Sequence, residues 1–165
     1  MNLEVISAGR ETATKPKPIV LVHGAWHGAW CWEDSFLPFF AAAGYAVHAL
    51  SLRAHGGSRA HGGSRGHGGS PGRDRLRWTS IADYTADLAS VAGKLSPAPI
   101  LIGHSMGGLV VQNYLERHEA PAAVLLASVP TSGATAAALR VLRDHPAQFA
   151  KINLKLSLYP VVETP

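Results

Sequence analysis

The sequence predicts an α/β fold, in which a mostly parallel β-sheet is flanked by helices. Two short apolar runs, residues 19–22 and 100–102, are continuous rather than alternating, which is typical of parallel strands buried on both faces. Segments of helical periodicity separate such runs, as crossover connections between parallel strands require. The chain of 165 residues is 47% hydrophobic and 16% charged, which is ordinary for a globular domain.

Apolar spacing and stop signals give the order of the elements. We expect strands at residues 19–22, 46–52, 100–102 and 122–128, and helices at 32–43, 80–96, 109–115, 136–143 and 146–156. Gly44 is a natural stop for the first helix. Ser80 and Asp83 have the spacing of a capping box at the start of the second, with an acid one carbon shorter than the usual Glu.

The pentapeptide from Gly103 to Gly107, Gly-His-Ser-Met-Gly, joins a buried strand to a helix. This order is that of a nucleophile elbow, in which a serine sits on a strained turn between strand and helix. Gly103 and Gly107 lack the Cβ atoms that would clash in such a turn. Ser105 is therefore the candidate catalytic nucleophile. The alternative interpretation is a glycine-rich turn between two core elements.

A second group of residues follows the strand at 19–22, where the tetrapeptide His-Gly-Ala-Trp occurs twice in succession. Acyl transfer by serine needs two backbone N–H donors for the oxyanion, one just after the nucleophile and one from the loop after an earlier strand. Met106 is expected to provide the first donor. We expect Ala25 to provide the second, with Trp26 as the alternative.

Three further residues are expected to shape these two turns: His104 in the elbow, and His23 and Gly24 in the oxyanion loop. His104 adjoins Ser105, whereas a general base must approach the nucleophile from across the site. For His23 we favour a structural role, hydrogen bonding to loop backbone, over proton transfer.

With these motifs the chain resembles the N-terminal part of the α/β-hydrolase superfamily, of the serine esterase and lipase-like type. The matching stretches are residues 20–32, 44–52 and 102–108, and with the intervening helices they span residues 18–130. The resemblance implies hydrolysis of carboxylic esters or related acyl compounds by a Ser-His-acid triad, with no cofactor and no metal. Its expected partner is a small-molecule acyl substrate. Serine at position 105 argues against the branches that resemble dehalogenases and epoxide hydrolases, which have aspartate there.

The resemblance also places the acid and the histidine after the serine, on loops that follow later strands. The strand at 122–128 ends without a carboxylate. His118 lies about 13 residues along a helix from Ser105, roughly 20 Å away, which is too far for a base. Asp144 and His145 are the remaining alternative. We therefore expect the triad acid and histidine to be absent from this chain, and the alternative function is a catalytically inactive truncated remnant or a noncatalytic binding or partner subunit.

The expected domain organisation follows from the same resemblance. Residues 1–130 form the N-terminal part of the hydrolase core, residues 131–165 begin an incomplete helical cap, and residues 54–71 are a tandem-repeat insertion. Truncation before the last strands leaves the strand at 122–128 as an exposed apolar edge, which is a template for pairing. Self-association or a complementing C-terminal half is therefore an expected partner.

The repeat consists of two Ala-His-Gly-Gly-Ser-Arg copies followed by Gly-His-Gly-Gly-Ser-Pro. We interpret it as a duplicated insertion in a surface loop, which lengthens at small entropic cost. A metal site formed by His55, His61 and His67 is the disfavoured alternative. A glycine-rich loop does not preorganise ligands, and the repeat contains neither a carboxylate nor a thiolate.

The formal net charge of +4 is concentrated in the same region. Six arginines stand there against one acid, Asp74: Arg53, Arg59, Arg65, Arg73, Arg75 and Arg77. A basic loop without an aromatic stacking platform gives only weak, salt-sensitive contact with nucleic acid, so we expect no nucleic-acid partner. We favour a solvated loop near the mouth of the site that attracts anionic substrates.

The N-terminal residues lack the basic start and long apolar core of a signal peptide. No apolar run approaches the roughly 20 residues that span a bilayer, so we expect no membrane span and a cytoplasmic location. The single cysteine, Cys31, excludes an internal disulfide and is expected to be a small buried hydrophobe rather than a nucleophile.

Overall fold

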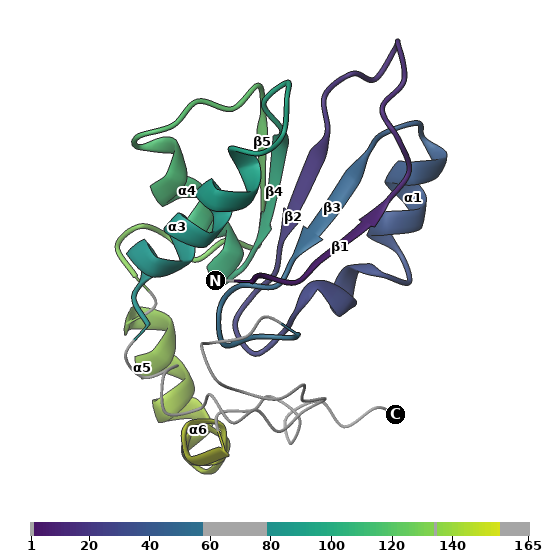
Figure 1. Ribbon diagram of the computed structural model, residues 1–165. Helices are drawn as coiled ribbons and strands as arrows, with labels where there is room; N and C mark the ends of the chain where they lie inside the picture. The colour runs from purple at the N-terminus through teal and green to yellow at the C-terminus, as the bar shows by residue number, and fades with distance from the viewer. Residues whose placement is uncertain (1, 58–78, 134, 156–165) are drawn as a thin grey trace. The chain divides into compact units, whose positions relative to one another are not determined.

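The computed structural model describes residues 2–57, 79–133 and 135–155 (Figure 1). The chain divides into two compact units, Met1–Ser128 and Val129–Pro165. The first unit contains, in chain order, β1 (Val5–Ala8), β2 (Ile19–Val22), a 3-10 helix η1 (Ala29–Trp32), α1 (Phe36–Ala42), β3 (Val47–Leu50), α3 (Ile81–Ala92), β4 (Ile100–His104), α4 (Met106–Leu115) and β5 (Ala123–Leu126).

The strands form a five-stranded sheet in the order β1-β3-β2-β4-β5. The four strands β3, β2, β4 and β5 are parallel, and β1 runs antiparallel to β3. In the centre of the sheet Leu21 pairs with Ala49 of β3 and with Ile102 of β4. The expectation of a mostly parallel sheet flanked by helices is confirmed, while β1 was not anticipated from the sequence.

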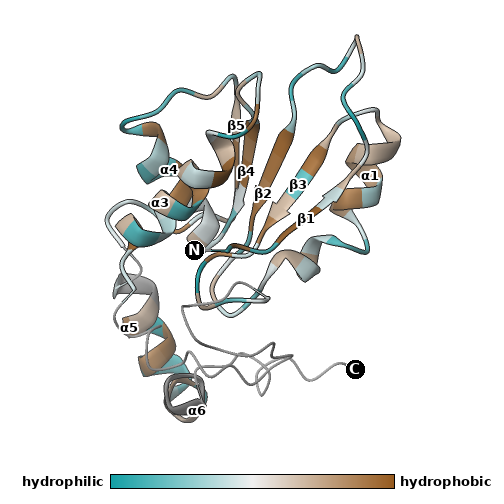
Figure 2. Cartoon of the chain, viewed as in Figure 1, coloured by the Kyte–Doolittle hydropathy of each residue, from teal (hydrophilic) through white to brown (hydrophobic). Residues whose placement is uncertain are grey.

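The two faces of the sheet bury alternate residues of the same strand. Val20 and Val22 of β2 pack with residues of α3 and α4, whereas Ile19 and Leu21 pack with residues of η1 and α1. Figure 1 shows α3 and α4 on one side of the sheet and α1 on the other, and Figure 2 shows the strands between them as the most hydrophobic part of this unit. All four side chains are buried. A continuous apolar run therefore marks a strand covered on both faces.

The ends of the helices follow local chemistry. Ser80 caps α3 in a capping box, since its hydroxyl accepts from the Asp83 N–H and the Asp83 carboxylate accepts from the Ser80 N–H. Gly44 ends α1 with a φ of +86°. The predicted start of this helix at Trp32 is wrong, because α1 begins at Phe36. Pro38 lacks an N–H and its ring would clash with the carbonyl four residues earlier, so the helix extends at most one turn before it.

Strand β5, which forms one edge of the described sheet opposite β1, is poorly covered. Val124 and Leu125 are 43% and 44% exposed, in contrast to the buried residues of β2 and β3. Helix α4 is tied to the end of this strand, where the Gln112 amide donates to the Ser128 hydroxyl over 2.8 Å. An apolar strand in this position is the exposed edge that the sequence predicts.

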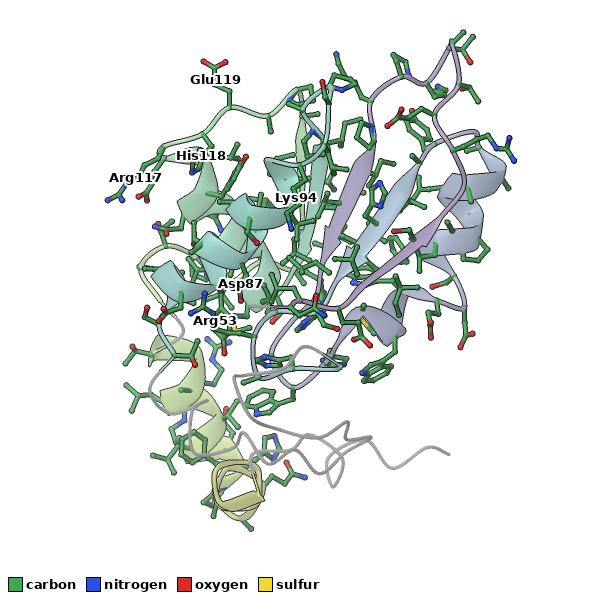
Figure 3. All side chains as sticks on the ribbon, in the orientation of Figure 1. Arg53, Asp87, Lys94, Arg117, His118 and Glu119 are labelled. Carbon is green, nitrogen blue, oxygen red and sulfur yellow. The ribbon has the colours of Figure 1, made fainter. Side chains whose placement is uncertain are left out.

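An ion pair fixes the start of the loop after β3. The Asp87 carboxylate, 1% exposed, accepts from the Arg53 backbone N–H (2.8 Å) and from the Arg53 guanidinium at Nη2 (2.7 Å) and Nε (3.0 Å). Asp83 accepts from the same guanidinium at 2.9 Å. Arg53 and Asp87 lie side by side in Figure 3. The expectation that Arg53 belongs to a solvated basic loop is therefore wrong, because a buried carboxylate on α3 neutralises it.

The second unit holds two helices, α5 (Thr135–Asp144) and α6 (Pro146–Lys155). The His145 N–H bonds to the Val141 carbonyl at 2.8 Å, and the Phe149 N–H bonds to the His145 carbonyl at 2.9 Å. Both helices agree closely with the predicted ranges. No helix among the described residues is long and apolar enough to cross a bilayer.

Replacing Asp87 by Ala should destabilise the fold by roughly 2–4 kcal/mol, because it leaves the Arg53 N–H and guanidinium without their buried acceptor. Urea unfolding followed by circular dichroism measures the change. Glu116→Gln is the matched control, since Glu116 is an exposed carboxylate that also accepts a side-chain hydrogen bond, from Asn113. It should shift stability by less than about 0.5 kcal/mol. Equal effects of the two variants would contradict the assigned role of Asp87.

Candidate active site

Strained backbone is concentrated at one edge of the sheet. Among the described residues, four that are not glycine have positive φ: Trp26 (64°), Ala54 (61°), Ser105 (53°) and Ala127 (44°). They follow β2, β3, β4 and β5 respectively, which places all four beyond the carboxyl ends of the parallel strands. Such conformations cost of order 1–3 kcal/mol each and cluster at functional sites. The carboxyl edge is also where open α/β sheets bind ligands.

Ser105 is the turn residue between β4 and α4, with φ 53° and ψ −117°. A Cβ on Gly103 would lie 2.5 Å from the Gly107 carbonyl oxygen, and a Cβ on Gly107 would lie 2.5 Å from the His23 carbonyl oxygen. Glycine is thus required at both positions for the turn to close. The Ser105 N–H bonds to the Leu126 carbonyl at 3.0 Å, which ties the turn to β5.

The loop after β2 packs directly against this turn. A Cβ on Gly24 would lie 3.1 Å from both the Ser105 Cβ and the His104 Nδ1. Within the part of the chain that the structure describes, the N–H groups of Ala25, Trp26 and Met106 have no hydrogen-bond acceptor. Backbone donors without acceptors are therefore present both on the loop and at the start of α4, where the helix dipole also favours an anion.

His23 joins this loop to the end of β3. Its Nε2 accepts from the Leu52 N–H at 3.0 Å, which leaves the proton on Nδ1 to be donated to the Gly24 carbonyl at 2.6 Å. The side chain is fully buried. Burial and the neighbouring His55 lower the pKa of His23 to about 3, so the ring is neutral and both its nitrogens are engaged. This geometry suits a structural role and leaves no lone pair for proton transfer.

The expectation that the repeat is exposed to solvent from its start is wrong at His55. It is 5% exposed, its ring lies 5.1 Å from that of His23, and it bonds to the Arg53 carbonyl through Nδ1 at 3.0 Å. Burial lowers its pKa as well. An imidazole fits here because it fills space between His23 and Tyr84. His61 and His67, the other members of the alternative metal site, lie outside the described residues.

The second copy of the tetrapeptide carries aromatic side chains beside the elbow. The His27 ring stacks on Trp30 at 5.6 Å and meets the His104 ring edge-on at 6.5 Å. His27 Nδ1 lies 2.9 Å from the Ala25 carbonyl oxygen. Trp26 and Trp30 are both exposed. The two copies therefore differ at their histidines, since His23 is fully buried and His27 is only partly buried.

The histidines that follow Ser105 do not approach it within the first unit. His118 lies beyond the far end of α4, stacked on Tyr114 at 4.4 Å, and Figure 3 shows it at the opposite end of this unit from Arg53 and Asp87. His145 belongs to the second unit and is exposed, and the adjoining Asp144 pairs with Arg143.

Cys31 is a partly buried free thiol whose pKa burial raises to about 11. It stays protonated near neutral pH, which fits a packing role.

Three polar residues with hydrogen bonds to these loops were not expected from the sequence: Glu4, Ser51 and Asp87. The Ala29 N–H donates to the Ser51 hydroxyl at 2.7 Å, and that hydroxyl donates to Glu4 at 2.6 Å. The burial of Asp87 could have been predicted from the sequence, since Asp87 falls on the apolar face of α3 between Tyr84 and Leu88. A carboxylate on such a face needs a buried partner.

The model of the Alpha/beta hydrolase family matches residues 19–162. Methyl jasmonate esterase 1 of Vitis vinifera is 35% identical over 105 residues, which are 62% of this chain and 35% of that protein. Salicylic acid-binding protein 2 of Nicotiana tabacum is 36% identical over 116 residues, 68% of this chain and 39% of that protein.

Solved structures agree on the fold. The monoacylglycerol lipase of Paleococcus ferrophilus has a TM-score of 0.57 at 24% identity, covering 88% of this chain and 53% of the lipase. Tomato methylketone synthase I, solved with 2-tridecanone, has a TM-score of 0.54 at 30% identity and covers 68% of this chain and 40% of that protein. The chain thus spans roughly half the length, or less, of the proteins that it matches.

Acid should destabilise the fold through His23. Because its folded pKa of about 3 lies below the ordinary 6.5, the unfolded chain binds more protons at low pH. The free energy of unfolding should therefore fall as the pH drops from about 6.5, by up to about 1.4 kcal/mol per pH unit from His23 alone. Urea unfolding between about pH 7.5 and about pH 5.5 measures this slope.

His23→Gln should flatten that slope. His48→Gln is the control. Burial lowers the pKa of His48 in the same direction, but His48 lies on β3 and is only half-buried, so this variant should flatten the slope less than His23→Gln does. If His23→Gln does not fold, the ¹⁵N shifts of His23 in the parent protein should report a neutral ring at about pH 5. A charged His23 ring at that pH would refute the assignment.

Proposed function

Because the chain belongs to the α/β-hydrolase family, we propose that it provides the nucleophile and the oxyanion hole of a serine hydrolase acting on carboxylic esters or related acyl substrates. The observation that carries this proposal is Ser105 in a strained, positive-φ turn with Gly24 of the preceding loop packed against it. A serine held in this way presents its hydroxyl at the edge of the sheet, next to amides with no other acceptor.

The proposed chemistry is acyl transfer in two steps. The Ser105 Oγ attacks the acyl carbon while its proton passes to a histidine base, and the carbonyl oxygen becomes an oxyanion. The N–H groups of Met106 and Ala25 stabilise that oxyanion, with Trp26 as the alternative second donor. Collapse expels the alcohol, which takes the proton from the histidine. Water then hydrolyses the acyl-serine by the same path in reverse.

Residues around the nucleophile are assigned supporting roles. Gly103 and Gly107 allow the turn to close, His104 shapes it, and His23 and Gly24 hold the oxyanion loop. The contacts of His23 with Leu52 and Gly24 favour this assignment over proton transfer. No metal or organic cofactor is required for this chemistry.

The base and the acid are proposed to come from outside these 165 residues. The β5 edge offers a route, since a complementing C-terminal half or a second copy that pairs there would extend the sheet on the side of β4 and bring its own turns to the same carboxyl edge. In this proposal residues 131–165 begin an incomplete helical cap. The location proposed is the cytoplasm, and no nucleic-acid partner is proposed.

The substrate class proposed is that of small carboxylic esters, supported by relatives that are named as esterases, among them methyl jasmonate esterase 1. Trp26 and Trp30 beside the elbow favour substrates with an apolar group. The arginines of the repeat would add attraction for anionic substrates.

One observation favours a second candidate, a noncatalytic binding or partner subunit or an inactive remnant. His118, the described histidine that follows the nucleophile within the first unit, is stacked on Tyr114 beyond the far end of α4. Without a base, Ser105 would be a weak nucleophile, and removal of triad members generally leaves only residual catalysis.

A fluorophosphonate probe should label Ser105 when the histidine base reaches it in an assembled triad, because the base activates the hydroxyl and the oxyanion hole binds the probe's phosphoryl oxygen. Peptide mapping by mass spectrometry should place the adduct on Ser105, and Ser105→Ala should abolish labelling. Ser128→Ala is the control, since this hydroxyl near the elbow has no assigned chemical role. Complete inertness of Ser105 in folded protein would favour the noncatalytic candidate.

The β5 edge should promote association. On size-exclusion chromatography the purified chain should elute above its monomer mass, and Val124→Lys should shift it toward the monomer by placing a charge on the strand. Phe39→Lys is the control, because Phe39 is 68% exposed but lies on α1, away from this edge. A folded wild-type monomer at all concentrations would argue against pairing through β5.

A further inference from the structure

A buried polar contact holds the far end of the oxyanion loop. Ala29 is the first residue of η1, and the preceding Gly28 has no side chain to cap that helix. The Ser51 hydroxyl at the end of β3 accepts from the Ala29 N–H at 2.7 Å instead. Ala29 and Ser51 are both fully buried, so no solvent is available to replace this acceptor.

Glu4 fixes the direction of the Ser51 hydroxyl. The hydroxyl donates to Glu4 Oε2 at 2.6 Å, a charge-assisted hydrogen bond, so its lone pairs are turned toward Ala29. The same oxygen of Glu4 accepts from the Gly57 N–H at 2.7 Å, and the Ser51 N–H donates to the Glu4 carbonyl at 2.9 Å. The backbone and the side chain of Glu4 therefore both form hydrogen bonds with Ser51 at the end of β3.

Close packing leaves this contact little freedom to shift. A Cβ on Gly56 would lie 2.7 Å from Glu4 Oε2, and a Cβ on Gly28 would lie 2.8 Å from the Gly56 Cα. Glycines at these positions let the oxyanion loop, the end of β3 and the loop after it meet at one point.

The oxyanion loop is thus held at both ends by two consecutive residues that directly follow β3. His23, at its start, bonds to the Leu52 N–H, and Ala29, at its end, bonds to the Ser51 hydroxyl. Between these anchors lie Ala25 and Trp26, the latter at a φ of 64°. A strained residue keeps such a conformation only where its surroundings fix it.

We propose that Ser51, oriented by Glu4, is a positioning residue that holds the oxyanion loop so that the Ala25 amide faces Ser105. The inference rests on the proposed function for the use of that amide, but the restraint on the loop is a separate physical claim. An oxyanion donor acts within about 2.7–3.1 Å of the developing charge, so a small displacement of the loop removes most of its effect.

Two measurements on the whole chain test it. Hydrogen–deuterium exchange of the peptide covering residues 23–30 should be at least about tenfold faster in Ser51→Ala, while exchange in β4 and α4 is unchanged. The rate of fluorophosphonate labelling at Ser105 should fall roughly 10–1000-fold, as expected for loss of one oxyanion donor.

Two substitutions of Glu4 should differ in how strongly they weaken the restraint on the loop. Glu4→Ala should reproduce the effect of Ser51→Ala, whereas Glu4→Gln keeps an acceptor oxygen for the hydroxyl and should stay within about threefold of wild type. Ser7→Ala is the matched control. It also removes a serine hydroxyl that links β1 to β3, through His48 at 2.8 Å, but it does not touch the loop.

The possible outcomes distinguish the proposed function from the proposed restraint on the loop. Wild-type protein that is not labelled, combined with faster loop exchange in Ser51→Ala, would refute the proposed function and support the restraint. A folded Ser51→Ala variant with unchanged loop exchange would overturn the inference, whatever its labelling rate. If Ser51→Ala does not fold, Glu4→Ala decides in the same way, since Glu4 is only partly buried.

Discussion

The arrangement of the site depends on the close approach of the start of α4 to the end of β2. Gly107 lies where any side chain would collide with the carbonyls of Val22 and His23. Because the two segments are in direct contact, the N-terminus of α4 lies next to the loop after β2, and Ser105 lies between them. The pairing of Val22 with Gly103 sets this meeting point, since it brings the two strands to the carboxyl edge at the same level.

Buried polar side chains hold the turns at that edge. His23 bonds to β3, Ser51 bonds to η1, and Asp87 holds Arg53 at the start of the next loop. Burying such groups costs free energy unless their hydrogen bonds are complete, and here most are. The described residues include two exceptions, Trp32 Nε1 and His55 Nε2. The strained φ angles at Trp26 and Ser105 are kept by this framework of fixed contacts.

Much of the fold was predictable, and the failures have physical causes. The central strands were predictable because burial on both faces requires a continuous apolar run. The capping box at Ser80 was predictable because it is a purely local interaction. The start of α1 was missed because the effect of Pro38 on the preceding turn outweighed the apolar pattern. His55 and Arg53 were misassigned to solvent because their partners, His23 and Asp87, are more than 30 residues distant in the sequence. No local pattern reveals a partner at such a separation.

The order of β2 to β5 and of helices α1, α3 and α4 could be read from the sequence alone, as could the serine at the turn between β4 and α4, since periodicity, glycine placement and capping are local to a few residues. Which polar groups are buried together, and how the loop after β2 meets the turn after β4, could be known only from the folded chain. Those relations depend on strand register and on contacts between segments far apart in the chain. They arise when the sheet assembles, because only then do the carboxyl ends of β2, β3 and β4 lie next to one another.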